Sequence, residues 1–362
     1  MKHWQETSRI LQLLARLAEQ GRGAALATVV NVQGSAYRRP GAKVLIADDG
    51  AMAGSVSGGC LEADVREVAL SVIRHGTPQL LHYDTGSDDE MPFGLGLGCN
   101  GSVDIFIQRA TTPDLIETSR RIAALLRRDE AFAVSTIVRG ATGLGRSMVV
   151  GTNGKRVGST GDANLDRMIA ARANEILGTG TSKLYDLEGH HLFTEILLPP
   201  PSLLVLGAGE DTRPLVAYAS DVGFRVTVVD HRPAYLTPDH YPAATRLIAA
   251  PSDSNISDLP LGPGAYAVVK THSLEHDREW VRRLLASEIR YIGVLGPRAR
   301  IEEVLRELGA EDDERVFGPV GLDLGAYGPE QIAVSIVAEL LALHWDREPV
   351  HLRTKESAIH AG

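Results

Sequence analysis

The chain of 362 residues is 44% hydrophobic and 23% charged, a composition typical of a globular protein with room for two domains. Its net charge of −9, without a block of lysine or arginine, argues against nucleic acid as a partner, and no apolar run approaches the roughly 20 residues that span a bilayer. Two cysteines far apart in the sequence favour a reducing cytoplasm over a disulfide framework.

The N-terminal half opens with an amphipathic helix at about 4–20 and continues with short strands, glycine turns and further helices. This mixture without repeats predicts an α+β domain. The predicted strands cover 25–34, 42–50, 51–58, 79–85, 102–110, 131–140 and 147–160, and the predicted helices cover about 61–74, 113–128 and 162–177.

A run of three prolines, Pro199 to Pro201, follows and marks a stiff linker, because it fits neither a helix nor a central strand. We therefore expect domains at 1–198 and 199–362. In the second domain, apolar strands at 202–209, 224–230, 265–273 and 291–297 alternate with helical segments. This alternation predicts a Rossmann-like parallel sheet, so the fold class is α/β, with an α+β domain followed by a parallel-sheet domain.

The turn Gly207-Ala-Gly209 lies between a strand and a helix, the context of a dinucleotide-binding turn, and Asp230 ends the next strand where a ribose would bind. Two features argue against a standard NAD site. The third glycine position holds Thr212, which predicts looser packing of the helix on the strand, and Glu210 and Asp211 stand where an anion would bind. Asp211 is equally consistent with a helix cap and with a ligand contact.

Polar residues gather at the predicted carboxyl ends of the strands, where ligands bind in such sheets. They are His231 and Thr271 together with the candidate binding residues Asp230, Arg232, His272, Asp277 and Arg298. His272, His276 and Asp277 could be read as metal ligands, but their spacing fits no strong zinc signature, so hydrogen-bonding roles are favoured and no metal site is predicted.

Both cysteines are embedded in glycine. Cys60 stands in GSVSGGCLE (54–62), just before a predicted helix, and Cys99 stands in GLGLGCNGS (94–102). Each is consistent with a small buried packing residue. The glycine flanks and the helix start equally favour a pair of functional thiols brought to one cleft.

Long segments of the chain, in order, resemble the XdhC/CoxI family of maturation factors for molybdenum hydroxylases such as xanthine dehydrogenase and carbon monoxide dehydrogenase. They are residues 32–65, 94–107, 207–209, 226–235, 270–277, 291–300 and 321–345. The resemblance implies an XdhC/CoxI domain followed by a Rossmann domain. It further implies transient binding of molybdenum cofactor (molybdopterin with its metal), sulfuration with a cysteine desulfurase, and transfer to an apo-hydroxylase. Glu210-Asp211 departs from the histidine of many relatives after Gly-Ala-Gly, which leaves the client enzyme open.

The resemblance gives the cysteine loops a chemical role. Ser55, Ser57, Gly58 and Gly59 could offer backbone amides to the cofactor's phosphate or oxo groups, and a Cys60 thiolate, favoured by the helix dipole, is a soft ligand for molybdenum. Cys60 and Cys99 are the candidate catalytic residues. Arg38 and Arg39 could supply counter-charge or be solvated loop charges. Glu62 is a candidate contact or base, with a structural carboxylate favoured.

The sequence is therefore consistent with three functions. The first is a maturation factor, a cofactor-binding chaperone rather than a stand-alone catalyst, which we expect to be a homodimer. The second is an NAD(P)-dependent oxidoreductase that uses the Rossmann turn for a nucleotide. The third is a thiol-dependent sulfur transfer through Cys60. The glycine-embedded cysteines favour the first and third, and the acidic pair Glu210-Asp211 counts against the second.

Overall fold

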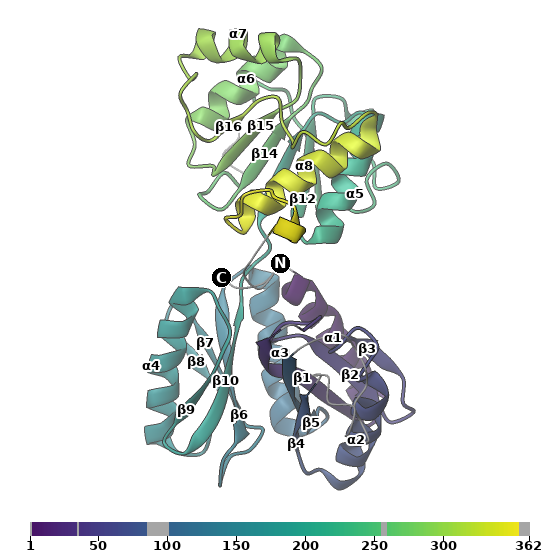
Figure 1. Cartoon of the computed structure of the whole chain (residues 1–362), viewed down its shortest axis with the longest axis vertical. Helices are drawn as coiled ribbons and strands as arrows, with labels where there is room; N and C mark the ends of the chain where they lie inside the picture. The colour runs from purple at the N-terminus through teal and green to yellow at the C-terminus, as the bar shows by residue number, and fades with distance from the viewer. Residues whose placement is uncertain (1, 35, 85–100, 255–258, 355–362) are drawn as a thin grey trace. The chain divides into compact units, whose positions relative to one another are not determined.

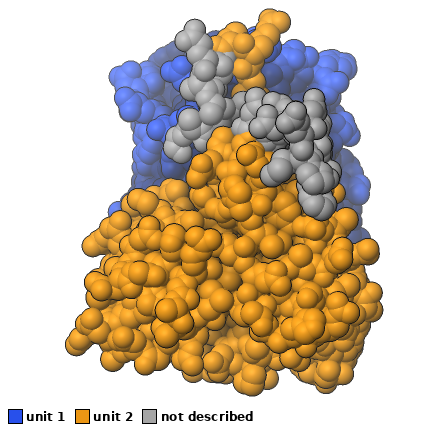
Figure 2. Space-filling view, turned by 60° about the horizontal axis from the view of Figure 1, so that its bottom comes forward, with its two compact units in different colours: residues 1, 200–351 blue, residues 2–199, 352–362 orange. Residues whose placement is uncertain are grey.

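The computed structural model describes residues 2–34, 36–84, 101–254 and 259–354. The chain divides into two compact units, residues 2–199 with 352–362 and residue 1 with 200–351 (Figure 2). The boundary thus falls within the run of three prolines. We call these the N-terminal and C-terminal units and describe each by itself. Among the described helices, none has the length and apolar character needed to cross a membrane.

The N-terminal unit contains two antiparallel sheets. The first has the order β3-β2-β1-β5-β4, and the second the order β8-β7-β6-β10-β9. The strands of the first sheet are β1 (Ala24–Gly34), β2 (Lys43–Ala47), β3 (Met52–Gly54), β4 (Gln79–Asp84) and β5 (Gly101–Arg109). Those of the second are β6 (Phe132–Arg139), β7 (Ser147–Gly151), β8 (Arg156–Val157), β9 (Lys183–Leu187) and β10 (His190–Leu197).

In the described part of this unit, four helices cover the sheets (Figure 1): α1 (Lys2–Glu19), α2 (Glu62–His75), α3 (Pro113–Arg128) and α4 (Ala163–Thr179). Apolar residues of α2 pack on one face of the first sheet and those of α4 on one face of the second. A shared core joins α1 and α3 to residues of both sheets, with Trp4, Leu45 and Phe132 among its members. The two sheets therefore form one unit because they bury a common apolar layer.

Local signals set the ends of these helices. Thr112 caps α3 by accepting a hydrogen bond from the Leu115 amide, and Pro113 follows in the first turn, where its missing N–H costs nothing. Asp162 caps α4 in the same way, and Gly180 ends it in the left-handed region at φ 68°.

The C-terminal unit is one parallel sheet in the order β13-β12-β11-β14-β15-β16. Helices α6 (Leu274–Leu285) and α7 (Arg298–Leu308) cover one face, and α5 (Arg213–Val222) and α8 (Pro329–His344) cover the other (Figure 1). The strands are β11 (Ser202–Leu206), β12 (Arg225–Asp230), β13 (Arg246–Ala249), β14 (Tyr266–Val269), β15 (Tyr291–Val294) and β16 (Val316–Phe317). Short 3-10 helices span Glu210–Thr212, Pro233–Tyr235 and, in the N-terminal unit, Leu352–Thr354.

The predicted fold class is confirmed: a mixed α/β protein with a Rossmann-type parallel sheet in its second half. Strand order reverses between β11 and β14, which is where ligands bind in doubly wound sheets. Several details differ from the prediction. Strands β9 and β10 were missed, because no element was predicted between the helix at 162–177 and the prolines. Strands β13 and β16 were missed because they are short, partly exposed edge strands. The strand predicted at 51–58 stops at Gly54, because the next residues turn their amides towards Glu62.

Candidate functional site

The loop between β3 and α2 closes around the carboxylate of Glu62. The hydroxyl of Ser55 donates to Glu62 Oε1 at 2.7 Å, and the hydroxyl of Ser57 donates to Oε2. The carboxylate also accepts four loop amides at 2.8–3.2 Å, those of Val56, Ser57, Gly58 and Gly59. We call these four amides the amide nest. The nest predicted for a cofactor anion is thus filled by a carboxylate of the chain itself.

These contacts decide the charge state of Glu62. Partial burial raises the pKa of the carboxyl, but the hydroxyls of Ser57 and Ser55 and the amides of Ser57 and Gly59 outweigh it and lower the pKa to about 2. A carboxylate with so low a pKa is a poor proton acceptor at neutral pH. The geometry therefore supports the structural alternative for Glu62 over a general base.

Cys60 is presented to solvent at the end of this loop. Its side chain is exposed, whereas the next residue, Leu61, is buried in the core beneath α2. Gly59 reaches φ 124°, in the left-handed region that favours glycine, so the loop can turn just before the thiol. Glu62 and Asp64 lie in the first turn of α2, and their charges offset the positive end of the helix dipole.

The second predicted thiol, Cys99, lies outside the described residues, as do Gly94, Gly96 and Gly98. Its approach to Cys60 therefore stays a prediction. Arg38, predicted as phosphate counter-charge, pairs instead with Glu6 of α1 at 2.6 Å. Its Nε atom is buried and has no hydrogen-bond partner among the described residues. Arg39, which follows it, has an exposed side chain.

The N-terminal unit also contains a buried ion pair that the sequence analysis missed. Lys43 of β2 pairs with Glu195 of β10, with only 9% and 7% of the two side chains exposed. Lys43 Nζ also donates to the carbonyl of Gly41 at 2.9 Å. The signal available in the sequence was a charged residue inside each of two apolar strands, KVLIA and HHLFTEIL. The pair connects the two sheets of the N-terminal unit.

In the C-terminal unit, the glycine turn after β11 is closed by its own side chains. A side chain at Gly207, which has φ 120°, would meet the backbone oxygen of Lys270 at 2.4 Å. A side chain at Gly209 would meet Asp211 Oδ1 at 2.3 Å, so the Asp211 carboxylate lies against the turn. Thr212 is fully buried, and its hydroxyl donates to the Gly207 carbonyl at 3.0 Å. The Thr212 hydroxyl thus ties the helix start to the turn, while the looser packing expected at this position stays a prediction.

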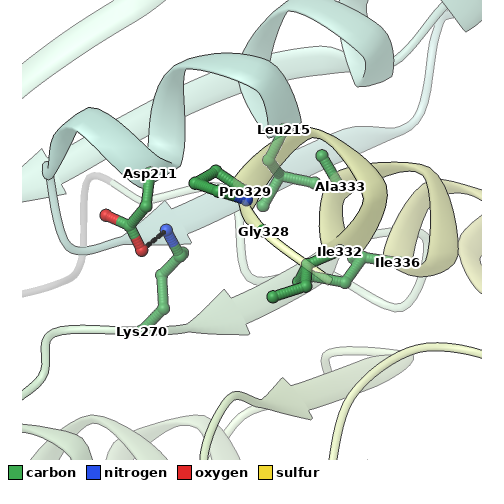
Figure 3. Close-up of a pocket in the computed structure, with 8 residues that line it drawn as sticks. All are labelled: Asp211, Leu215, Lys270, Gly328, Pro329, Ile332, Ala333 and Ile336. Carbon is green, nitrogen blue, oxygen red and sulfur yellow. Dashed lines mark hydrogen bonds and ion pairs between the residues drawn. The ribbon is translucent and has the colours of Figure 1, made fainter. Parts of the chain in front are cut away.

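Lys270 occupies the point at which the strand order reverses (Figure 3). Its ammonium group donates to Asp211 Oδ2 at 2.7 Å and to Thr212 Oγ1 at 2.8 Å, and its side chain is 2% exposed. His272 Nε2 lies 3.0 Å from the same Asp211 oxygen. Burial lowers the pKa of the Lys270 ammonium, and the Asp211 carboxylate opposes this effect. Asp211 thus engages a buried cation rather than a helix amide.

The cavity beside this pair measures about 90 Å³, well below the roughly 300–1,000 Å³ of sites for drug-sized ligands. Figure 3 shows it between Asp211 and Lys270 on one side and α8 on the other, with Pro329 and Ile332 at the wall. The cavity is therefore bordered by a buried cation and a carboxylate and is too small to enclose a dinucleotide. Sequence reasoning missed Lys270, although a lysine directly after the apolar run AYAVV was a visible signal.

The other predicted residues follow the carboxyl ends of the strands, and two of them, Asp230 and Asp277, each accept a backbone amide and pair with an arginine. Asp230 accepts the Ala208 amide at 2.6 Å and pairs with Arg232 at 2.9 Å. Asp277 accepts the Thr271 amide at 3.0 Å and pairs with Arg300 at 2.5 Å. Arg298 is exposed at the start of α7. Within the described parts of the chain, no group of three histidine, cysteine or acidic side chains is placed to hold a metal ion.

Comparison with known proteins agrees with this architecture. The family model of the XdhC Rossmann domain matches residues 203–340 of this chain. The model of the XdhC and CoxI family matches residues 17–84 and 125–188. The chain is 34% identical to a probable xanthine dehydrogenase subunit of Bacillus subtilis, over 91% of this chain and 96% of that one. It is 23% identical to the molybdenum cofactor insertion chaperone PaoD of Escherichia coli, over 94% of this chain and 89% of PaoD.

A solved structure described as a xanthine dehydrogenase of Bacillus halodurans superposes with a TM-score of 0.79 at 30% identity, covering 94% of this chain and 96% of that one. The sequence matches thus extend over both units, and so does the structural match. The chain belongs to the XdhC and CoxI family.

Proposed function

We propose that this protein is a maturation factor for a molybdenum hydroxylase of the xanthine dehydrogenase or carbon monoxide dehydrogenase type. In this proposal it binds molybdenum cofactor transiently, assists its sulfuration together with a cysteine desulfurase, and passes it to the apo-enzyme. It acts as a cofactor-binding chaperone and as a homodimer. Family membership and the full-length similarity to PaoD, whose name states cofactor insertion, support the proposal.

The observation that carries the proposal is the exposed Cys60 thiol on a loop held in place by Glu62. A protein that receives and releases a molybdenum centre benefits from a soft ligand at its surface, and a thiolate is such a ligand. The hydrogen bonds to Glu62 hold the backbone from Val56 to Gly59, so the chain that leads to Cys60 is ordered before any ligand arrives.

Cys60 would bind the cofactor through its molybdenum. The amide nest would not bind the phosphate of the cofactor, because Glu62 already fills it. The oxidoreductase alternative has less support, because the cavity at the switch point measures only about 90 Å³ and the turn amides of Ala208 and Gly209 already donate to Asp230 and Thr212.

The test is performed in a host that makes both the chain and its client hydroxylase. Deletion of the chain should leave the hydroxylase folded but inactive. Cys60→Ser should reproduce most of that loss, because a hydroxyl is a hard ligand that is not ionised near neutral pH. Glu67→Gln, an exposed change on the same helix, is the matched control and should leave client activity unchanged.

Two measurements on the purified hydroxylase separate the steps. A low molybdenum content indicates failed insertion, whereas normal molybdenum with little cyanide-labile sulfur indicates failed sulfuration. Full client activity with Cys60→Ser would contradict the role of the thiol, and a fully active client after deletion would contradict the whole proposal. Light scattering that shows a monomer would remove the homodimer from it.

A further inference from the structure

A second candidate binding site lies in the N-terminal unit, in a cleft between its two sheets. The cleft is lined by residues near the start of β4, the end of β5, the first turns of α3, the turn between β6 and β7, and β8. Its volume of about 480 Å³ falls within the roughly 300–1,000 Å³ of small-molecule sites. It is about five times the volume of the cavity at the switch point.

Three arginines line this cleft: Arg109 at the end of β5, Arg121 on α3 and Arg146 before β7. Arg121 pairs with Glu117 at 2.7 Å. The side chains of Arg109 and Arg146 are exposed and make no hydrogen bond or ion pair with any residue that the structure describes. A guanidinium is built for bidentate contacts with phosphate, so two unpaired guanidinium groups in one cleft are a recognition element for an anion.

The close approach of the two sheets brings these arginines to the same cleft. Gly145 has φ 80°, and a side chain there would meet the Gln108 carboxamide oxygen at 2.7 Å. The turn between β6 and β7 therefore lies against the end of β5. Arg146 follows Gly145 directly and Arg109 follows Gln108 directly, so this contact places both residues at the mouth of the cleft.

The remaining walls combine the start of a helix with apolar surface. Helix α3 begins at the cleft, with Thr112 in the lining, and the N-terminal end of a helix attracts negative charge. Asp114 in its first turn also lines the cleft and offsets part of this attraction, so the two arginines supply most of the positive charge. Leu144 is 38% exposed and lines the cleft together with Val157 and Pro78. Such a surface suits a flat ring, whereas a bare inorganic ion would leave it in water.

We propose that this cleft binds a small molecule that carries a phosphate group on a ring system, with Arg109 and Arg146 on the phosphate and the apolar wall on the ring. At the two anion sites expected from the sequence, the chain's own carboxylates already accept amides: Glu62 accepts those of the amide nest, and Asp230 accepts the Ala208 amide of the Gly207 turn. Among the described residues, the guanidinium groups of Arg109 and Arg146 have no such internal partner.

The cleft is separate from the proposed thiol site. Cys60 lies before the first residue of α2, whereas the cleft begins just after its last residue, at Gly76. A helix of 14 residues is about 20 Å long. The inference therefore does not rest on the proposed function, and its ligand has two possible sources, a nucleotide or the phosphorylated pterin of molybdenum cofactor.

Calorimetry on the full chain tests the inference with three probes: AMP, inorganic phosphate, and molybdenum cofactor released anaerobically from a donor enzyme. We expect AMP or the cofactor to bind more tightly than phosphate. The double variant Arg109→Gln/Arg146→Gln should weaken that binding on the order of a hundredfold, since each charged hydrogen bond accounts for roughly tenfold or more. Both side chains are exposed, so thermal unfolding of the variant should match the wild type.

Arg120→Gln is the matched control, because Arg120 is exposed on α3 and does not line the cleft. It should leave binding unchanged. Binding of AMP alone that depends on the two arginines supports the cleft while leaving the cofactor proposal without support from this site. Cofactor binding that survives the double variant overturns the cleft and leaves the proposed function standing. No binding by any probe, or equal losses with Arg120→Gln, also overturns it.

Discussion

Replacement of Glu62 by glutamine tests the view that this carboxylate organises the cysteine loop. Glutamine keeps the size of the side chain but loses the charge that the amide nest and two hydroxyls stabilise. The lowering of the Glu62 pKa from 4.5 to about 2 means that the loop stabilises the ionised carboxylate by at most about 3 kcal/mol. Because Glu62 is only partly buried, solvent screening reduces this to about 1–2 kcal/mol.

The readout is hydrogen–deuterium exchange of the peptide that contains residues 56–59. A loss of about 1–2 kcal/mol should speed exchange of these amides roughly 5- to 30-fold at neutral pH. A depressed pKa gives stability that is present above the ordinary value and is lost as the pH falls from 4.5 towards 2. The difference between wild type and variant should therefore shrink over that range.

Glu67→Gln on the same helix is the control, since the Glu67 side chain is exposed and has no partner among the described residues. Equal exchange rates in Glu62→Gln and wild type at pH 7 would refute the reasoning. So would a difference that stays constant below pH 4.5, because it could not come from the ionised carboxylate.

Three further outcomes are expected. Glu195→Ala should lower the free energy of unfolding by about 3–5 kcal/mol in urea titrations, because it leaves Lys43 buried without its partner. A change below about 1 kcal/mol would show that solvent screens this ion pair. Gly207→Ala should lower the free energy of unfolding by about 2 kcal/mol or more, because its side chain would meet the Lys270 carbonyl oxygen at 2.4 Å. The control Gly262→Ala has open space around it and should lower this free energy little. Equal thermal unfolding of the two variants would contradict the close approach at Gly207. Calorimetry with NAD and NADP on the double variant Arg109→Gln/Arg146→Gln, which removes the arginines of the N-terminal cleft, should show no binding at micromolar concentrations. Micromolar affinity of this variant for either nucleotide would revive the oxidoreductase alternative.

The sequence by itself determined those features that depend on neighbouring residues. Apolar strands that alternate with amphipathic helices specified the parallel sheet of the C-terminal unit, because each βα step is a local pattern. The start of α2 near Leu61 and the glycine turn after β11 were equally visible, since caps and turns depend on a few adjacent residues. The family resemblance was available for the same reason, in long ordered motifs.

The tertiary structure alone decided which groups remain free to act. The two antiparallel sheets of the N-terminal unit arise from distant pairings such as β1 with β5, which no local pattern specifies. Lys43 finds Glu195 across 152 positions, and Lys270 finds Asp211 across 59. A charged residue in a sequence is a candidate for binding, but burial makes an unpaired charge costly, so the fold pairs many such residues with each other. Arg38 and Asp211 were paired in this way, with partners 32 and 59 positions away, because long-range packing selects the partner of each charge. Arg109 and Arg146 were left exposed at a cleft.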